Sequence, residues 1–251
     1  MDTTQKFTGK AEQYARYRPR YPDAYLEYLM AAAGLQTGDV VADVGSGTGI
    51  LTRQLLARGL QVWAVEPNAD MRAVAESHLG DQPGFRSVAA TAENTSLEDH
   101  SVSLVAAAQS FHWFDRPRFR QECSRILRPG APVALVWNNR DMEQEINQEL
   151  ERVCIDLCPN FVAFGGGIED EPAVFQEFFQ GGQFEHRVFD NAERHDLAGF
   201  LGRNLSNSYA PLAGDDNYQP FVCAMEALFA RYAAGEFITL PMETNSYFGT
   251  V

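Results

Sequence analysis

Apolar runs that alternate with helical patterns constrain the fold of this chain more than any other feature of its sequence. The apolar runs cover residues 39–45, 61–67, 84–91, 101–110 and 131–138. The helical patterns between them cover residues 50–59, 69–79 and 116–130. The runs at 101–110 and 131–138 are apolar without alternation, which is typical of parallel strands covered on both faces. We therefore predict a doubly wound α/β sheet with right-handed crossovers and with ligands at the carboxyl ends of its strands.

The acidic composition argues against nucleic acid as a partner. The 251 residues carry a formal net charge of -14 at pH 7. Such a surface repels a phosphate backbone, because nucleic-acid affinity rests on Lys and Arg displacing counterions. The first residues lack the apolar core of a secretory signal, and no stretch approaches the roughly 20 apolar residues of a membrane-spanning helix. We expect a cytoplasmic protein that binds neither nucleic acid nor membrane.

Four cysteines form no pattern that predicts a metal site or a disulfide framework. They are Cys123, Cys154, Cys158 and Cys223. The chain has one C-x3-C pair, no second pair, and no histidines at zinc-finger spacing. A chain of this size does not need disulfides to fold. We expect buried, reduced thiols and no bound metal.

A glycine-rich turn follows the first of the apolar runs. Gly45, Gly47 and Gly49 lie where this strand turns into a helix, and residues without Cβ accept positive φ and let a ligand approach the main chain. The next apolar run ends in Glu66, which is 23 positions after Asp43 (66 - 43). This is close to the roughly 20-residue spacing at which a carboxylate binds a ribose diol. The pair of features predicts a nucleoside-containing cofactor.

The charge and spacing of this turn indicate which cofactor it binds. The dinucleotide fingerprint is G-x-G-x-x-G, whereas Ile50 stands here at the place of the third glycine. Asp43 precedes the glycines by two positions, and the turn has no lysine. A carboxylate is unfavourable beside a pyrophosphate and favourable beside an ammonium and a sulfonium. The pattern favours S-adenosylmethionine.

Five segments resemble, in order, the motifs of class I S-adenosylmethionine-dependent methyltransferases. They are VADVGSGTG at 41–49, VWAVEPNADM at 62–71, AATAENTSL at 89–97, SFHWFD at 110–115 and SRILRPGAPVALVW at 124–137. The similarity is closest to the type 11, small-molecule branch that includes proteins resembling trans-aconitate methyltransferase. It covers residues 7–140. Ala131 departs from the family pattern, because a second glycine commonly follows the PG pair.

The resemblance implies a Rossmann-like, seven-stranded sheet that is mostly parallel, with helices on both faces and an antiparallel last strand. The last strand is expected at 237–251, which is the end of a single domain over 1–251. The expected parts of this domain are an N-terminal arm at 1–22, a cofactor-binding core at 23–140, a substrate cover at 141–215, and a last helix and strand at 216–251.

The resemblance also implies the cofactor contacts. Asp43 is expected near the methionine amino group, which Gln109 also meets, and Glu66 on the ribose hydroxyls. Ala92 and Glu93 are candidates for the adenine edge, although Glu93 also suits a solvated surface. The expected cofactor-binding residues are Tyr14, Arg18, Asp43, Gly45, Ser46, Gly47, Gly49, Glu66, Pro67, Met71, Ala92, Glu93 and Gln109.

The arm has two alternative roles. Tyr14, Arg18 and Tyr21 could close over the bound molecules, with Arg18 pairing a carboxylate bidentately and Tyr21 on the substrate side. Alternatively the arm is a surface strap whose tyrosines anchor it to the core.

Several residues beyond the strand ends are substrate-side candidates, namely Tyr21, Trp113, Asn138, Arg140, Arg203 and Tyr209. His112 is the candidate general base, because imidazole titrates near neutrality; its alternative role is a hydrogen bond within its loop. Arg140 suits an anionic substrate or a plain surface charge, and Arg203 and Tyr209 suit a lid.

The predicted reaction is methyl transfer from S-adenosylmethionine to a small molecule, such as a carboxylate or hydroxyl compound, by in-line displacement. A carboxylate acceptor needs no base, whereas a hydroxyl acceptor does. Two other functions stay open. A non-catalytic protein could bind the nucleoside on the same fold, and a nicotinamide-dependent oxidoreductase would need a third fingerprint glycine. The sequence leaves open whether the protein is a monomer or a homodimer.

Overall fold

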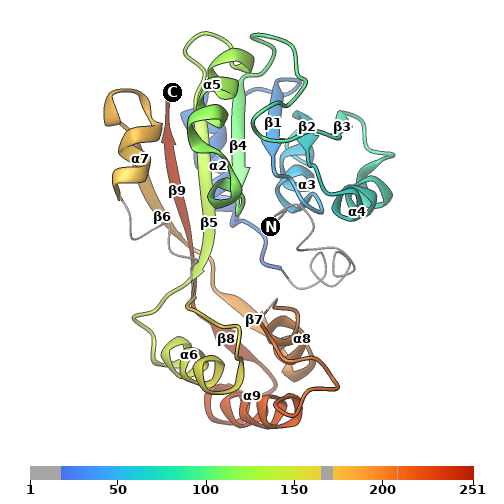
Figure 1. Cartoon of the computed structure of the whole chain (residues 1–251), viewed down its shortest axis with the longest axis vertical. Coiled ribbons are helices and arrows are strands. Elements are labelled where there is room, and N and C mark those ends of the chain that lie inside the picture. The colour runs from blue at the N-terminus through green and yellow to red at the C-terminus, as the bar shows by residue number, and fades with distance from the viewer. Residues whose placement is uncertain (1–17, 165–171, 208) are drawn as a thin grey trace.

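The computed structural model describes residues 18–164, 172–207 and 209–251, and these residues form a sheet lobe and a smaller lobe below it (Figure 1). The sheet lobe holds seven strands in the order β3-β2-β1-β4-β5-β9-β6. Their bounds are Val40–Val44 (β1), Gln61–Val65 (β2), Phe85–Val88 (β3), Leu104–Ala108 (β4), Val133–Arg140 (β5), Glu185–Asp190 (β6) and Met242–Gly249 (β9). Only β9 runs antiparallel to its neighbours, β5 and β6. The predicted sheet and its antiparallel last strand are confirmed.

Helices cover both faces of this sheet, as the apolar strand patterns predicted. The bounds are Asp23–Ala32 (α2), Ile50–Leu56 (α3), Ala69–Leu79 (α4), Arg116–Ile126 (α5) and Pro172–Phe178 (α7). Along β4, Val105 packs into one core cluster with Phe119 of α5, whereas Leu104 packs into the other with Leu55 of α3. Successive residues of one strand therefore supply two cores, so alternation between apolar and polar residues is absent.

The smaller lobe, called the cap lobe here, is built from five elements. They are α6 (Glu145–Leu157), β7 (Glu193–His195), α8 (Leu197–Leu205), α9 (Tyr218–Tyr232) and β8 (Ile238–Leu240). Its own apolar core includes Leu150, Phe200, Phe221 and Met225, which are fully buried. Figure 1 shows β5 and β9 leading from the sheet toward this lobe, and they stay paired as far as Arg140 opposite Met242.

The chain enters and leaves the cap lobe at neighbouring points. Residues 184–195 form two strands, β6 and β7, and the predicted strand 237–251 is divided into β8 and β9. Pro241 separates β8 from β9, and the Asn191 amide donates to the Met242 carbonyl beside it, at 2.9 Å. Because β6 pairs with β9 and β7 pairs with β8, two long antiparallel strands bend together at the boundary between the lobes.

The segment 141–215, expected to cover the substrate, contributes to both lobes. Its helices α6 and α8 lie in the cap lobe, whereas α7 and β6 lie on the sheet. Phe175 and Phe178 of α7 pack against Phe111 and Trp137, which explains why α7 belongs to the sheet lobe. The last helix, α9, packs against α6 and α8 in the cap lobe.

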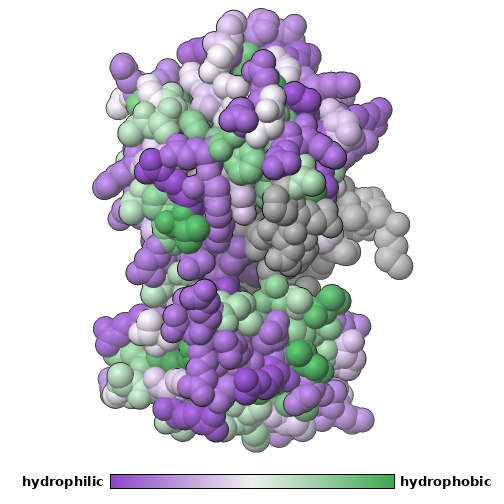
Figure 2. All heavy atoms as spheres, turned by 90° about the vertical axis from the view of Figure 1, so that its left-hand side faces the viewer, coloured by the Kyte–Doolittle hydropathy of each residue, from purple (hydrophilic) through white to green (hydrophobic). Residues whose placement is uncertain are grey.

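Hydrophilic residues cover much of the face shown in Figure 2, and the apolar residues on it lie in separate patches. Within residues 18–164, 172–207 and 209–251, no helix is long and apolar enough to cross a membrane. Three of the four cysteines, Cys123, Cys154 and Cys158, are buried and unpaired, and Cys223 is exposed. The prediction of buried thiols is therefore right for these three and wrong for Cys223, which lies at the surface of α9.

We expect Gly49→Ala to destabilise the protein more than Gly34→Ala does. Both glycines have left-handed φ, +80° and +62°, so each alanine costs about 1–2 kcal/mol of backbone strain. A Cβ on Gly49 would also lie 2.7 Å from Leu79 Cδ1, whereas one on Gly34 meets nothing within 4 Å. The overlap adds about 1–3 kcal/mol. Urea unfolding of both variants measures the difference, and equal free energies of unfolding would refute the packing role of Gly49.

Candidate functional site

A cavity of about 480 Å³ lies at the carboxyl ends of β1, β2, β4 and β5, and residues of the cap lobe close its far end. The predicted residues that line it are Arg18, Tyr21, Asp43, Gly45, Ser46, Gly47, Glu66, Pro67, Met71, Ala92, Glu93, Gln109, His112, Trp113, Asn138, Arg140, Arg203 and Tyr209. These residues come from eight segments of the chain, and the fold brings them together around one cavity. The position of the cavity agrees with the rule for open α/β sheets.

Two predicted cofactor contacts do not appear among the residues that line the cavity. Gly49 precedes α3 and packs its Cα side against Leu79 and Ala75 of α4. Its missing side chain thus lets two helices approach each other. Tyr14 lies outside the described residues.

Asp43 is a buried carboxylate at the end of β1. Its Oδ2 accepts a hydrogen bond from Thr52 Oγ1 at 2.6 Å, and the side chain has no exposed surface. Its Oδ1 has no hydrogen-bond partner in the part of the chain that the structure describes. Burial raises the pKa of Asp43 to about 6. A bound cation would supply the missing partner, because an uncompensated buried carboxylate is costly.

The glycine turn brings its backbone to the second carboxylate, Glu66 at the end of β2. The Gly47 amide donates to Glu66 Oε2 at 3.0 Å, and the Asn68 amide donates to Oε1 at 2.8 Å. Burial raises the pKa of Glu66, and these two amide hydrogen bonds oppose the rise. Gly45 has a φ of +70°, and a Cβ there would lie 2.5 Å from Ser110 Cβ. Glycine is therefore required at Gly45 by both conformation and space.

Gln109 lies at the end of β4 in a left-handed conformation, with a φ of +58°. Such backbone strain in a residue other than glycine persists only where surrounding contacts hold it. Here the Gln109 amide donates to the Val136 carbonyl at 2.9 Å, and the side-chain Nε2 donates to the Asn138 carbonyl at 2.9 Å. Gln109 therefore ties β4 to β5 at the cavity wall.

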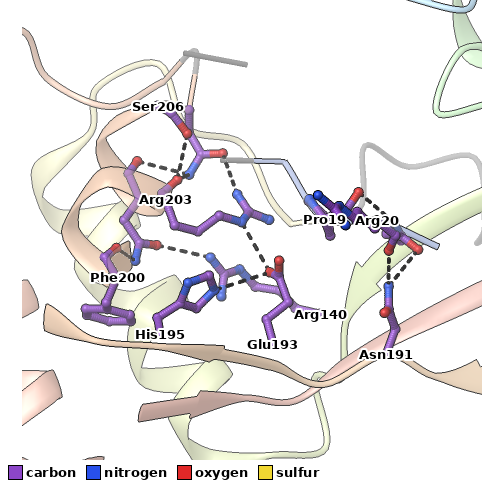
Figure 3. Close-up of polar contacts among 12 residues, drawn as sticks. Pro19, Arg20, Arg140, Asn191, Glu193, His195, Phe200, Arg203 and Ser206 are labelled. Atoms are coloured by element: carbon purple, nitrogen blue, oxygen red, sulfur yellow. Dashed lines mark hydrogen bonds and ion pairs between the residues drawn. The ribbon is translucent and has the colours of Figure 1, made fainter. Parts of the chain in front are cut away.

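Asn138 lines the cavity, but its side-chain amide is engaged within the protein. Its Oδ1 accepts from Thr244 Oγ1 at 2.5 Å and from Asn191 Nδ2 at 3.1 Å. Its Nδ2 donates to the Arg20 carbonyl at 3.3 Å, and Asn191 Nδ2 donates to the same carbonyl at 2.9 Å (Figure 3). The two asparagines therefore fasten the chain before α2 to the sheet.

His112 and Trp113 lie in the short 3-10 helix η2 (Phe111–Trp113) that follows β4. Their ring centroids are 4.5 Å apart, and 39% of the surface of Trp113 is exposed. The buried neighbour Phe111 packs against Phe178 of α7 and fixes the loop to the sheet. The two residues therefore stand at the cavity on a loop anchored by an aromatic core.

The cap end of the cavity holds two buried arginines, Arg140 from β5 and Arg203 from α8 (Figure 3). Arg203 Nε donates to Glu193 Oε2 at 3.3 Å. Burial lowers the pKa of Arg140, and it lowers that of Arg203 to about 10. Tyr209 lies beside them, and burial raises its pKa to about 12. Both arginines stay charged at neutral pH, because the ordinary pKa of arginine lies far above 7.

Sequence reasoning missed several residues at this end. Phe164 lines the cavity and lies under the Arg140 guanidinium, 4.6 Å from its carbon to the ring centroid. Asn207 also lines the cavity, and Glu193 holds Arg203. Asn207 belongs to the segment LSNSYAP, whose resemblance to the family could have pointed to it. No local pattern marked Phe164 or Glu193, because their roles depend on contacts with Arg140 of β5 and Arg203 of α8.

The glycine-turn end of the cavity fits S-adenosylmethionine. Two buried carboxylates flank the glycine turn, and Asp43 Oδ1 has no hydrogen-bond partner among the residues that the structure describes. An ammonium can pair with Asp43, and a ribose diol can donate to the remaining lone pairs of Glu66. A pyrophosphate would meet these carboxylates with like charge. The side chains and the backbone therefore suit a cationic nucleoside.

Comparisons with known proteins agree with this reading. Residues 42–135 match a protein family described as a methyltransferase domain. An uncharacterised methyltransferase of Mycobacterium tuberculosis is 41% identical over 140 residues, which cover 56% of this chain and 55% of that protein. The matched region thus spans about half the length of the curated relatives. The likeness in sequence lies where the cofactor motifs were predicted.

Solved structures extend the likeness to the whole fold. A chain from Anaeromyxobacter dehalogenans, provisionally assigned as a type II methyltransferase, has a TM-score of 0.70 and 25% identity, covering 93% of this chain and 98% of that one. A phosphoethanolamine N-methyltransferase of Haemonchus contortus, solved with S-adenosylhomocysteine, has a TM-score of 0.56 and 18% identity, covering 100% of this chain and 59% of that one. The cofactor prediction is confirmed by these matches. Residues 42–135 thus carry a methyltransferase domain, and its cofactor is S-adenosylmethionine.

Proposed function

We propose that this protein transfers the methyl group of S-adenosylmethionine to a small-molecule acceptor. One observation carries the proposal: the buried Asp43 oxygen without a partner faces the same cavity as Glu66 and the glycine turn. A volume of about 480 Å³ suits two small ligands side by side and excludes a macromolecular chain within the cavity. The formal charge of -14 further disfavours nucleic acid as the acceptor.

The proposal assigns roles to the lining residues. Asp43 and Gln109 would hold the methionine end, and Glu66 the ribose. The adenine would lie among Pro67, Met71, Ala92 and Glu93, which line the cavity. The acceptor side would comprise Tyr21, Trp113, Asn138, Arg140, Arg203 and Tyr209, with Arg18 between the two sides.

When bound, the cofactor would supply a methyl group on a cationic sulfur; the acceptor would bond to the methyl carbon in line as the neutral thioether S-adenosylhomocysteine leaves. The chain's own contribution is to hold both molecules in one orientation and to exclude water. The cap lobe performs the second task, because Phe164, Arg203 and Tyr209 close the cavity opposite the strand ends. His112 would take the proton from an acceptor that presents a hydroxyl group.

Titration calorimetry tests the cofactor assignment. We expect S-adenosylmethionine and S-adenosylhomocysteine to bind with micromolar affinity and NAD to show no heat, because the carboxylates repel a pyrophosphate. A screen with a radiolabelled methyl group over small hydroxy acids, phosphorylated alcohols, phenols and amines then identifies the acceptor. Binding of NAD alone would overturn the proposal. Cofactor binding without any transfer would favour a non-catalytic protein.

Asp43→Asn should stabilise the ligand-free protein and weaken cofactor binding. The pKa of Asp43 is raised from 3.8 to about 6, so the folded state holds the proton more tightly than the unfolded state does. Ionisation therefore destabilises the fold as pH rises through about 6, by at most about 3 kcal/mol at 1.36 kcal/mol per pKa unit.

At pH 8 we expect the ligand-free Asp43→Asn variant to melt a few degrees above wild type, with the gap closing toward pH 4. The affinity for S-adenosylhomocysteine should fall about tenfold or more, because the ammonium loses a charged partner. Asp156→Asn on the exposed face of α6 is the matched control and should change neither property. A lower melting temperature for Asp43→Asn at pH 8 would contradict the expected cost of this charge.

His112→Gln should lower kcat about 100-fold for a hydroxyl acceptor, because the group that takes the acceptor proton is lost. The affinity for S-adenosylhomocysteine should stay close to that of wild type. His78→Gln, at an exposed position of α4, is the control. An unchanged kcat would refute the role of His112 as a general base and leave it only a position in the cavity wall.

A further inference from the structure

Arg140 is a buried cation without an anionic partner. Its side chain donates to two neutral amide oxygens, from Nη1 to Asn147 Oδ1 at 3.3 Å and from Nη2 to Asn204 Oδ1 at 3.1 Å. The guanidinium also lies over the ring of Phe164, and the charge of Glu193 acts on it from beyond 4.0 Å. No carboxylate lies within 4.0 Å of it in residues 18–164, 172–207 and 209–251. Only 8% of its surface is exposed, so water does not compensate the charge.

Arg203 is a second buried cation at this end of the cavity, and it shares the carboxylate of Glu193 with His195. Glu193 accepts from Arg203 at 3.3 Å, and His195 Nε2 lies 3.7 Å from the same Glu193 oxygen (Figure 3). Burial alone would raise the pKa of Glu193, but its bond to His195 and the charge of Arg203 hold it below the ordinary value. One carboxylate therefore faces two buried guanidinium groups. Arg18 also lines the cavity, and its charge acts on both Arg140 and Arg203.

Arg140 lies far from the Asp43 carboxylate at the cofactor end of the cavity. Asp43 pairs with Ala106 of β4, and Ala106 pairs with Ala134 of β5. Arg140 is six residues beyond Ala134 (140 - 134), which corresponds to roughly 20 Å along an extended strand. The cavity is therefore acidic at one end and basic at the other. A cationic cofactor is attracted to the first end and repelled from the second.

From this charge pattern we propose that the methyl acceptor carries a carboxylate or phosphate group that docks between Arg140 and Arg203. This inference rests on the proposed function. A small anion would complete the pairing that the protein leaves open, because a buried guanidinium without a counter-ion is strongly unfavourable. It would also bridge the two lobes, since Arg140 belongs to β5 of the sheet and Arg203 to α8 of the cap.

The docked anion is an anchor and not the methylated group. Guanidinium forks occupy the lone pairs of a carboxylate or phosphate and lower its nucleophilicity. The methyl group must lie near the cofactor end, close to Gln109 and His112. The acceptor is therefore a molecule with an anionic group at one end and a separate nucleophilic atom at the other.

The test uses malonate and inorganic phosphate as probes of this anion site, with malonamide as the uncharged match for malonate. Binding to the full chain is measured by calorimetry and by melting temperature, in chloride buffers of equal ionic strength, with and without S-adenosylhomocysteine. We expect malonate or phosphate to raise the melting temperature by several degrees at 10 mM. A preference between the two probes tells carboxylate from phosphate. Malonamide and extra chloride should produce no rise.

Arg140→Gln and Arg203→Gln should each weaken the probe about tenfold or more and leave S-adenosylhomocysteine binding unchanged. Arg152→Gln, on the exposed face of α6, removes the same charge from the cap lobe and should bind the probe as wild type does. Circular dichroism checks the fold of each variant. If Arg140→Gln does not fold, Arg140→Lys keeps the charge, loses the fork, and should still bind the probe at least several-fold more weakly.

The outcomes separate this inference from the proposed function. It is overturned if wild-type protein responds equally to malonate, malonamide and chloride, or if the arginine variants bind the probe as wild type does. It stands if the response depends on Arg140 and Arg203, even when S-adenosylhomocysteine fails to bind. In that last case only the proposed function falls, because the anion site exists without the cofactor.

Discussion

The antiparallel pairing of β5 with β9 is the interaction on which the rest of the structure depends. The ladder runs from Val133 opposite Gly249 to Arg140 opposite Met242, so its first half lies in the sheet and its end reaches the cap lobe. Trp137 and Tyr247 on these strands pack against Phe175 of α7, which locks the ladder into the core. One continuous element thus supports both the strand ends at the glycine turn and the arginine at the cap end of the cavity.

This continuity explains why the cavity can hold opposite charges at its two ends. Asp43 and Glu66 terminate short strands, whereas Arg140 terminates a strand that extends six residues beyond the level of Asp43. Had β5 ended with β1 and β4, the guanidinium would lie beside the carboxylates and neutralise them. The length of β5 therefore separates the groups that would otherwise form an ion pair. Among residues 18–164, 172–207 and 209–251, the separation leaves Asp43 Oδ1 without a hydrogen-bond partner and Arg140 without an ion pair.

The parts predicted correctly from the sequence are those whose information is local. Asp43, the glycine turn and Glu66 lie within 24 residues, and their spacing indicates a nucleoside site without knowledge of the rest. The environment of Arg140 was not predictable in this way. Its partner Asn204 is 64 positions away, and nothing local distinguishes a buried guanidinium from a surface charge. The division of the predicted strand 237–251 into β8 and β9 was missed for the same reason, because the bend is defined by the strands beside it.

Asn138 illustrates how a cavity residue can act through the backbone it holds. Its side chain accepts from Thr244 and Asn191 and donates to the Arg20 carbonyl, so β5, β9 and the segment before α2 meet at one amide. Tyr21 follows directly and is anchored by the Gln54 side chain, which accepts from the Tyr21 amide at 3.0 Å and donates to its carbonyl at 2.7 Å. Arg18 and Tyr21 are thus positioned at the cavity by contacts outside it. The entry of the chain into the fold is therefore part of the site, because the same hydrogen bonds fix both.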